Sequence, residues 1–484
     1  MATRKRNPIT ISNFNGGGLA DSKWSGIEDS LYRMVGVDPH SEPAVLKSES
    51  KLTKNSGTTV DEFVKNIVVS SNGRTYHFSS ASGKIWERTG AGAWSLVHTT
   101  TPAAGAAACL GAIEYEGYII WATESRLHRI LATDGEGSAE WTANAQEDWQ
   151  TFTNTDDEFH PMIIQNLDLY IGDANYLALW DGSVFTADAL DIKTPLRIKS
   201  LGKIVTDVLL GTYVDDNINK TEILRWNTWS VSFTTLDPIE EVGINAFIPA
   251  DNFVFVSAGK KGNIYYYDGS QLELFKKIPA VYAITDGVMI HPDAVANVGG
   301  NQILFGVSNV SGNPAPQGVY RIGRHSRNYD WIMDLAYPIS ERSAGALVLT
   351  GIEIGAIDVI DDQIIVSWKN GATYGVDLLD ASNKLDGAYI ESRVMRPDRL
   401  VLGMFRNLIM SYNDLPTLTD LTLTFDKNYA GSYTTPTSSQ VTDVDRKFIT
   451  LEEGIEAVAL QLKVEFTTNG NDTPSLESID ILLE

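Results

Sequence analysis

The feature that most constrains the fold is a loose internal repeat that runs through the middle of the chain. In each copy, a stretch of alternating apolar residues is followed by a polar or glycine-containing turn, an aromatic-rich stretch, another turn and a third stretch. Short alternating segments bounded by Gly, Asn, Asp and Ser are typical of β-strands joined by tight turns. The copies occupy residues 67–97, 112–135, 162–185, 203–233, 253–275, 302–333 and 357–379.

The spacing of the copies favours one all-β architecture. The middles of the aromatic stretches lie about 48 residues apart on average, which suits a four-stranded propeller blade. The marker residues are Trp86, Arg129, Trp180, Trp226, Tyr267, Ile322 and Tyr374. One such sheet leaves an apolar face uncovered, whereas sheets stacked in a ring cover one another. Since no run of amphipathic helices interrupts the repeat, an α/β barrel is disfavoured, and a β-propeller of about seven blades is predicted for residues 61–387.

Three consecutive tyrosines in the fifth copy raise the question of what the aromatic stretches do. They lie in GNIYYYDGSQLELFKK (262–277). Because strand side chains alternate between two faces, Tyr265 and Tyr267 are expected on one side and Tyr266 on the other. At least one face is expected to pack between sheets. A ligand-binding platform is the alternative interpretation.

The pattern changes from residue 388 onward. Six strand candidates follow, separated by Asn-Asp, Thr-Pro and Asn-Gly-Asn-Asp turns. One of them, ALQLKVEF (459–466), alternates cleanly. The residues on its apolar face are Leu460, Leu462, Val464 and Phe466. Residues 388–484 are therefore predicted to form a β-sandwich or jelly-roll-like domain beside the propeller.

The first 60 residues are predicted to form an N-terminal arm. Ser25 as a cap, Glu28 at the capping-box position and Gly36 after the end predict a short helix over residues 26–36. The extended stretch DPHSEPAVLKS (38–48) follows. Together they predict a short helical latch that binds either the ring or a neighbouring subunit.

The charge balance argues against general nucleic-acid binding. The chain has 38 Lys and Arg against 62 Asp and Glu, a formal charge of -24, which repels a phosphate backbone. Arg4, Lys5 and Arg6 form a short basic segment that is either solvated or in contact with an acidic neighbour. No apolar stretch follows it, so neither a signal peptide nor a membrane span is predicted, and synthesis in a cytoplasm is expected.

Residues that commonly carry chemistry are scattered along the chain. Cys109 is the only cysteine, which excludes an internal disulfide, and it is expected to be a small buried hydrophobic side chain. The histidines show no metal-binding spacing; they are His40, His77, His98, His128, His160, His291 and His325. The nucleophile elbow, the phosphate-binding loop and the dinucleotide fingerprint are missing. No catalytic residue, cofactor site or metal site is therefore predicted.

Adjacent carboxylates keep two chemical alternatives open. The pairs lie at residues 156–157, 215–216, 361–362 and 452–453. All four are in turn-like sequences, where Asp accepts hydrogen bonds from its own backbone. Propeller glycoside hydrolases use two carboxylates about 5 to 10 Å apart, which makes Asp215 and Asp361 the candidates for that activity. Residues 153–158 and 214–219 offer oxygen ligands for calcium without the spacing of a helix-loop-helix site.

Three parts of the chain resemble the β-propeller proteins of tailed-bacteriophage tails, of the nozzle and hub type. They are ISNFNGGGLADSKWSGIEDSLYRMVGVDPHSEPAVLK (11–47), the irregular repeats, and ALQLKVEFTTNGNDTPSLESIDILLE (459–484). The resemblance implies a non-enzymatic structural protein of the virion tail. It also implies a homo-oligomeric ring around the tail axis that contacts neighbouring tail or adaptor proteins and forms part of the DNA exit channel. The acidic composition agrees, because a negative lumen lets DNA pass without sequence-specific binding.

Two other functions remain as alternatives at this point. A carbohydrate-binding adhesin of the tail-fibre type would use aromatic turns around Trp226, Trp229 and Tyr329, on which sugars stack. A propeller glycoside hydrolase would use the carboxylates named above. The loops DDNINKTE (215–222) and SGNPAPQG (311–318) are expected to be exposed and suit contacts with a host.

Overall fold

The computed structural model of the chain is dominated by antiparallel β-sheets. It describes residues 8–483 except 15, 21, 25–29, 58, 90–91, 155–157, 215–217, 236–237, 279–286, 300, 310–316, 342–350, 397–402 and 437–447. Within the described residues, helical structure is confined to α1 (Gly137–Asn144) and a 3-10 turn at Ala132–Asp134. The prediction of an all-β chain is confirmed.

Five consecutive four-stranded sheets follow one another along the chain, and in each of them successive strands pair side by side. The first comprises β6 (Val64–Val69), β7 (Thr75–Ser79), β8 (Lys84–Arg88) and β9 (Trp94–Thr99). The second comprises β10 (Gly111–Tyr115), β11 (Tyr118–Ala122), β12 (Arg126–Leu131) and β13 (Gln146–Thr151). The third comprises β14 (Met162–Gln165), β15 (Asp168–Asp173), β16 (Tyr176–Trp180) and β17 (Phe185–Asp191). The fourth comprises β18 (Arg197–Ile204), β19 (Asp207–Tyr213), β20 (Ile223–Trp226) and β21 (Thr234–Thr235). The fifth comprises β22 (Ile244–Pro249), β23 (Val254–Ala258), β24 (Asn263–Tyr267) and β25 (Leu272–Lys277).

Two further sheets follow, and both recruit strands from elsewhere in the chain. One contains β26 (Val288–Met289), β27 (Val295–Gly299), β28 (Gln302–Asn309), β29 (Gly318–Gly323) and β30 (Ile332–Tyr337), and it continues into other strands beyond β30. The other contains β31 (Ile352–Ile360), β32 (Gln363–Asn370) and β33 (Thr373–Lys384), and its fourth strand is β5 (Ser50–Lys54) from the N-terminal arm. Six of the seven marker residues lie in the third strand of a four-stranded sheet, and Ile322 lies in β29, the third strand counted from β27.

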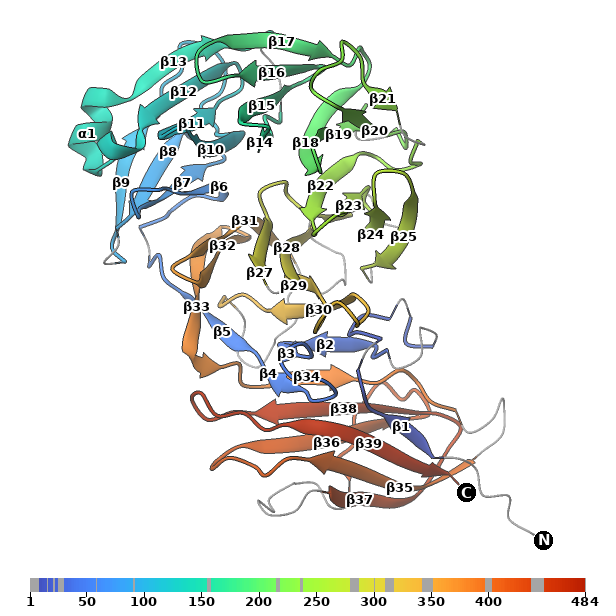
Figure 1. Cartoon of the computed structure of the whole chain (residues 1–484). Helices are drawn as coiled ribbons and strands as arrows, with labels where there is room; N and C mark the ends of the chain where they lie inside the picture. Colours follow the sequence, from blue (N-terminus) through green and yellow to red (C-terminus); the bar gives the residue numbers. More distant parts are fainter. Residues whose placement is uncertain are drawn as a thin grey trace.

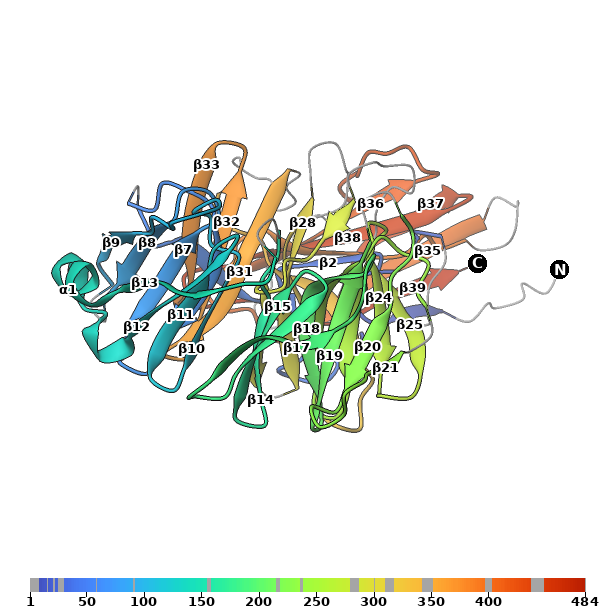
Figure 2. The same cartoon turned by 90° about the horizontal axis from the view of Figure 1, so that it is seen from above.

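The sheets are arranged around a common axis (Figure 1). Their first strands contact one another in the order β6, β10, β14, β18, β22, β27 and β31, and β31 contacts β6 again, which closes the circle. Seen from above, the sheets stand side by side (Figure 2). This is the arrangement of a β-propeller, in which apolar residues of adjacent sheets pack together: Phe78 of the first sheet and Trp121 of the second lie 6.2 Å apart between ring centroids.

The tyrosine triplet of β24 is part of this packing. Tyr267 is fully buried and, with the half-buried Tyr265, belongs to the core between the fourth and fifth sheets. Tyr266 points to the other face, where its ring centroid lies 4.6 Å from that of Phe253. The packing interpretation is confirmed for both faces of the strand.

Two sheets beside the ring are built from the C-terminal strands and the N-terminal arm (Figure 1). One contains β2 (Arg33–Val35), β34 (Ala388–Glu391), β38 (Leu460–Thr467) and β36 (Asp420–Lys427); the other contains β1 (Ile9–Ile11), β39 (Leu476–Leu483), β35 (Gly403–Tyr412) and β37 (Phe448–Ala457). They share one core, to which both Leu462 and Met410 belong. The six strands predicted after residue 388 are therefore present, and the alternating face of β38 is buried as expected.

Strand β2 joins the ring to these sheets. It pairs in parallel with β30 and antiparallel with β34, so one sheet runs without a break from β28 through β2 to β36. The helix predicted over residues 26–36 is wrong where the structure describes it, because Arg33–Val35 is this strand; Ser25 and Glu28 lie outside the described residues. Local capping signals are weak, and burial of Met34 and Val35 between two partner strands outweighs them.

The arm is fixed to the ring by a buried charge cluster. Arg321 of β29 is 1% exposed and binds the carboxylates of Asp334 (2.9 Å) and of Glu49 from the arm. The His40 imidazole, also from the arm, lies 3.3 Å from Asp334. Burial raises the pKa of Glu49 to about 7, although Arg321 opposes that shift. The short strands β3 (Val37–Asp38) and β4 (Lys47–Ser48) hold this part of the arm in place.

Candidate functional site

The paired carboxylates do not converge on a catalytic centre among the described residues. Asp361 and Asp362 form the exposed turn between β31 and β32, with φ of 48° and 62°. Residues 156–157 and 215–216, including Asp215, lie outside the described residues, as does half of each calcium candidate. The turn predicted for residues 452–453 is wrong: they are paired within β37, because strand pairing with β35 overrides the local preference of adjacent acids.

Two pairs of histidines lie near each other, His40 with His325 and His98 with His128 on either side of Trp121, and several histidines have structural partners. His160 Nδ1 lies 2.7 Å from the carbonyl oxygen of Gly172, and His98 Nε2 lies 2.7 Å from a carboxylate oxygen of Glu147. His325 Nδ1 lies 2.6 Å from the carbonyl oxygen of His40. In the part of the chain that the structure describes, no three His, Cys, Asp or Glu residues come together as metal ligands would. Cys109 is buried, as predicted, and its thiol lies 3.4 Å from the Gly111 carbonyl oxygen.

The aromatic residues proposed for sugar stacking differ in exposure. Trp226 is only 5% exposed, and its indole N–H donates to the Ser230 carbonyl oxygen at 2.7 Å. Its ring packs edge-on against Tyr170, so it is a core residue and the expectation of an exposed platform there is wrong. Trp229, in contrast, is 86% exposed, and Tyr329 is partly exposed beside His325.

Trp229 belongs to a group of exposed apolar side chains in the turns of the third and fourth sheets. We call this group the apolar turns; its members are Leu167, Val184, Val205, Trp229 and Val231. Their exposed fractions range from 58% at Val184 to 99% at Val231. All five lie in turns that join first to second strands or third to fourth strands, and in a propeller these turns share one face.

Hydrogen bonds from the turn of Leu167 reach the turns of Val205 and Trp229, the latter through the Asn166 amide and the Thr228 hydroxyl at 3.4 Å. The side-chain amide of Asn166 donates to the Thr206 carbonyl oxygen at 2.9 Å, and that of Gln165 donates to the Val205 carbonyl oxygen at 2.9 Å. These bonds connect the third sheet to the fourth. The Tyr115 hydroxyl of the second sheet donates to the Leu167 carbonyl oxygen at 2.6 Å. The apolar side chains are thus presented on a fixed backbone.

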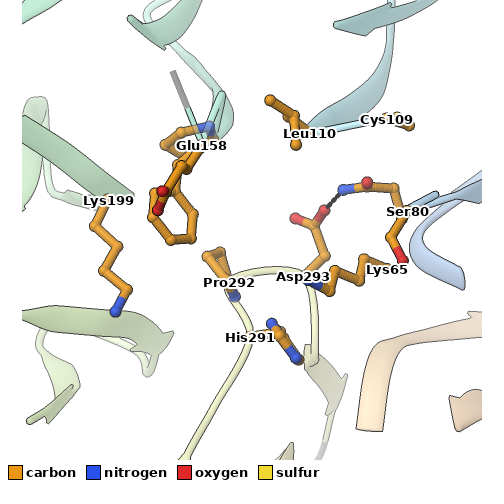
Figure 3. A pocket seen from close by; sticks show the side chains of 12 residues that line it. Lys65, Ser80, Cys109, Leu110, Glu158, Lys199, His291, Pro292 and Asp293 are labelled. Atoms are coloured by element: carbon orange, nitrogen blue, oxygen red, sulfur yellow. Dashed lines mark hydrogen bonds between the residues drawn. The ribbon is translucent and has the colours of Figure 1, made fainter. Parts of the chain in front are cut away.

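A second candidate site is a cavity near the ring axis, at the opposite end of the first strands. We call it the axial cavity; its volume is about 70 Å³. Its lining residues come from five sheets and are Lys65, Asn66, Ser80, Cys109, Leu110, Glu158, Phe159, Pro161, Lys199, His291, Pro292 and Asp293 (Figure 3). Most of them precede or begin a first strand, whereas the apolar turns include Leu167 and Val205, which follow one.

The electrostatics of the axial cavity are mixed. Asn66 donates its side-chain amide to the Asp293 carboxylate. Burial, together with the nearby Asp358, raises the pKa of Asp293 to about 7. Burial and three lysines, Lys65 among them, lower the pKa of His291 well below its usual value, so its imidazole is neutral at physiological pH.

Sequence reasoning did not find the axial cavity. The only sequence signal is a lysine near the start of each of two first strands, Lys65 in VKNIVV (64–69) and Lys199 in RIKSLGKI (197–204), since a charged residue is unusual in a core strand. Which ends of these strands meet at the axis depends on ring closure, and ring closure involves residues hundreds of positions apart.

Comparison with known proteins was made at the levels of sequence and structure. No protein-family model and no curated protein matches the chain, and no helix among its described residues is long and apolar enough to cross a membrane. Similar solved structures include the extracellular domain of a hybrid two component system from B. thetaiotaomicron (13% identity, 79% of this chain and 44% of that chain, TM-score 0.47). Another is virginiamycin B lyase from Staphylococcus aureus (14% identity, 69% of this chain and 100% of that chain, TM-score 0.47). A third is YCF48 from Cyanidioschyzon merolae (11% identity, 69% of this chain and 100% of that chain, TM-score 0.42). This chain spans less than half of the first structure, and at these identities and TM-scores none of the three activities is transferred to it.

Proposed function

We propose that the protein is a non-enzymatic structural component of a tailed-bacteriophage virion, a nozzle or hub protein of the tail. In this proposal, a seven-bladed propeller and a C-terminal β-sandwich form one rigid unit, and several copies assemble as a ring around the tail axis. The virion tail is then its location, and neighbouring tail or adaptor proteins are its partners. The proposal rests on the sequence resemblance and on one structural observation, the apolar turns.

The chemistry of the apolar turns favours a protein contact over a sugar contact. Sugar recognition combines an aromatic platform with convergent polar groups. The polar side chains in the turn of Trp229, Asn227 and Ser230, are bonded within the turn, whereas Val231 in the same turn is 99% exposed. Contiguous exposed apolar side chains on a soluble protein mark an interaction surface, and tryptophan is enriched at the energetic centre of protein interfaces. We therefore infer contact with another copy of the chain or with a neighbouring tail protein rather than with a glycan.

The route of DNA in this proposal is the axis of the assembled ring of copies. The axis of a single propeller is not proposed as the route, since lysine, histidine and carboxylate side chains from five sheets come together around the axial cavity there. The net charge of -24 suits a channel wall from which DNA does not need to be released.

The proposal is tested by the oligomeric state of the purified full-length protein. Mass photometry and electron microscopy are expected to show a ring with a defined copy number. Replacing both Trp229→Ser and Val231→Ser should weaken assembly by about thirtyfold or more, because losing an interface centre costs about 2 kcal/mol or more. The matched control is Leu418→Ser, which removes a 78% exposed side chain between β35 and β36.

The outcomes separate the functional alternatives. Assembly that Leu418→Ser leaves intact and the double variant weakens supports the proposal. A protein that remains monomeric at all concentrations and is absent from particles contradicts it. Specific binding on a glycan array that Trp229→Ser abolishes would favour the adhesin instead.

A further inference from the structure

Beside the axial cavity, lysine and histidine side chains gather around Phe63, and two residues of this group, Lys65 and His291, also line the cavity. The ammonium groups of Lys65 and Lys369 lie 5.9 Å and 5.6 Å from the centre of the Phe63 ring. The His291 ring centroid lies 6.1 Å from the same centre. Two positive charges and an imidazole from three different sheets therefore converge beside the axis. Lys199 adds a third lysine to the cavity wall.

The two lysines beside Phe63 differ in whether they are neutralised. Lys369 donates to the Glu353 carboxylate at 2.9 Å. Among the described residues, Lys65 has neither a hydrogen bond nor an ion pair, and burial lowers its pKa. Its side chain is partly buried, and the carboxylates of Glu353 and Glu158 attract its charge without a direct ion pair. Lys65 is thus a cation at the cavity wall whose ammonium group can still donate to a ligand.

The next residue in the chain, Asn66, has a side-chain oxygen that no hydrogen-bond donor reaches among the described residues. Asn66 is 4% exposed and lines the same cavity. Its Nδ2 group is used by Asp293, while its Oδ1 atom is buried and has no hydrogen-bond partner among the described residues. Buried amide oxygens in proteins are nearly always hydrogen-bonded. The cavity wall therefore carries both a donor, Lys65, and an acceptor that lacks a donor, Asn66.

We propose that the axial cavity binds a small oxyanion that carries a proton, of which hydrogen phosphate is the simplest example. Its charged oxygens accept from the Lys65 ammonium, and its hydroxyl group donates to Asn66 Oδ1. A fully ionised oxyanion such as sulfate accepts a hydrogen bond from the lysine but has no hydroxyl group that could donate one to the asparagine. This inference is independent of the proposed role in a virion.

The acidic groups around the cavity are compatible with such a ligand. With a pKa of about 7, Asp293 is only partly charged at neutral pH. Glu158 also lines the cavity, and it takes part in interactions within the protein. The other acidic side chains of the protein surface repel an anion in the cavity only weakly when they lie more than about 8 Å away, because that is the Debye length at physiological ionic strength.

The test compares phosphate with sulfate on the full-length protein. At pH 7 and constant ionic strength, phosphate is expected to raise the Tm in a saturable way and to give a binding isotherm by calorimetry. Sulfate should bind at least about tenfold more weakly, because a hydrogen bond to a buried charged group contributes more than 1 kcal/mol. Lys65→Met should weaken phosphate binding by about tenfold or more. The matched control is Lys203→Met, which removes an exposed lysine at the other end of β18.

Several results would overturn the inference. Equal binding of phosphate and sulfate would mean that no ligand hydroxyl donates to Asn66 Oδ1. No response to either would mean that ordered water molecules fill the cavity, as they commonly do for buried polar groups. Unchanged binding by Lys65→Met would place any phosphate elsewhere. If Lys65→Met does not fold, phosphorus NMR of the wild-type protein with sulfate as competitor decides: phosphate broadening that sulfate removes at equal concentration counts against the proposal.

Discussion

At the scale of single residues, the closure of the ring depends on positions without a side chain. A Cβ atom at Gly355 of β31 would lie 1.9 Å from the Val64 carbonyl oxygen of the first sheet, and one at Gly111 of β10 would lie 1.9 Å from the His160 carbonyl oxygen. Both neighbours are backbone atoms, which cannot rotate away. Glycine is required where two backbones approach this closely, so these two residues set how near the first strands come to each other.

We expect Gly355→Ala to destabilise the protein by about 1 to 3 kcal/mol, the usual cost of forcing an extra group into a packed site. Urea denaturation followed by tryptophan fluorescence measures the loss. Ser95→Ala, at an exposed position of β9, should change the free energy of unfolding by less than about 0.5 kcal/mol. Equal effects of the two substitutions would show that the first and last sheets do not approach as described.

At the scale of elements, the N-terminal arm carries a buried carboxyl group, that of Glu49, whose titration changes the stability of the fold. Glu49 has a pKa of about 7 in the folded protein, above its ordinary value of 4.5, because it is buried. The folded state therefore holds a proton there that the unfolded state has released. This contribution to stability is fully present below about pH 4.5 and is lost as the pH rises through about 7. His40, whose pKa burial lowers, acts in the opposite sense as the pH falls below 6.5.

We expect Glu49→Gln to remove the part of the pH dependence that belongs to the glutamate. Between pH 5 and pH 8 the wild type loses the stability that comes from the protonated Glu49, whereas the variant has no such group. The free energy of unfolding of the variant should therefore gain about 2 kcal/mol relative to the wild type over this interval. Glu42→Gln, in an exposed part of the same arm where Glu42 pairs with Lys47, is the control. Parallel curves for wild type and Glu49→Gln over this range would contradict the prediction.

At the scale of the whole molecule, the N-terminal arm connects the ring to the C-terminal sheets by pairing its strands with both. Strand β5 completes the last sheet of the ring, and β2 links β30 to β34. Leu52 of β5 is buried in the core of the last sheet, and Met34 of β2 in the core shared with the C-terminal strands. The predicted division into residues 1–60, 61–387 and 388–484 therefore marks changes of pattern along the chain, while the cores cross both boundaries.

We expect residues 61–387 alone to lack a cooperative thermal unfolding transition, because that fragment leaves β33 as an open edge and uncovers the core under Leu52. Circular dichroism and scanning calorimetry on the fragment and on the full chain test this. Adding the arm, as residues 8–387, should restore part of the stability through β5. A fragment 61–387 as stable as the full chain would show that the ring does not depend on the arm.

What the sequence alone determined is local: alternation, turn residues and their spacing placed the strands of the repeat and the six strands after residue 388, because these depend on a few neighbouring side chains. The tertiary structure decided the rest. It turned Arg33–Val35 into a strand, buried Trp226 and exposed Trp229, and brought Lys65 and Asn66 to a shared cavity. These outcomes depend on which distant strands pair and which strand ends meet at the axis, and the free energy of those contacts comes from burial between residues far apart in the chain.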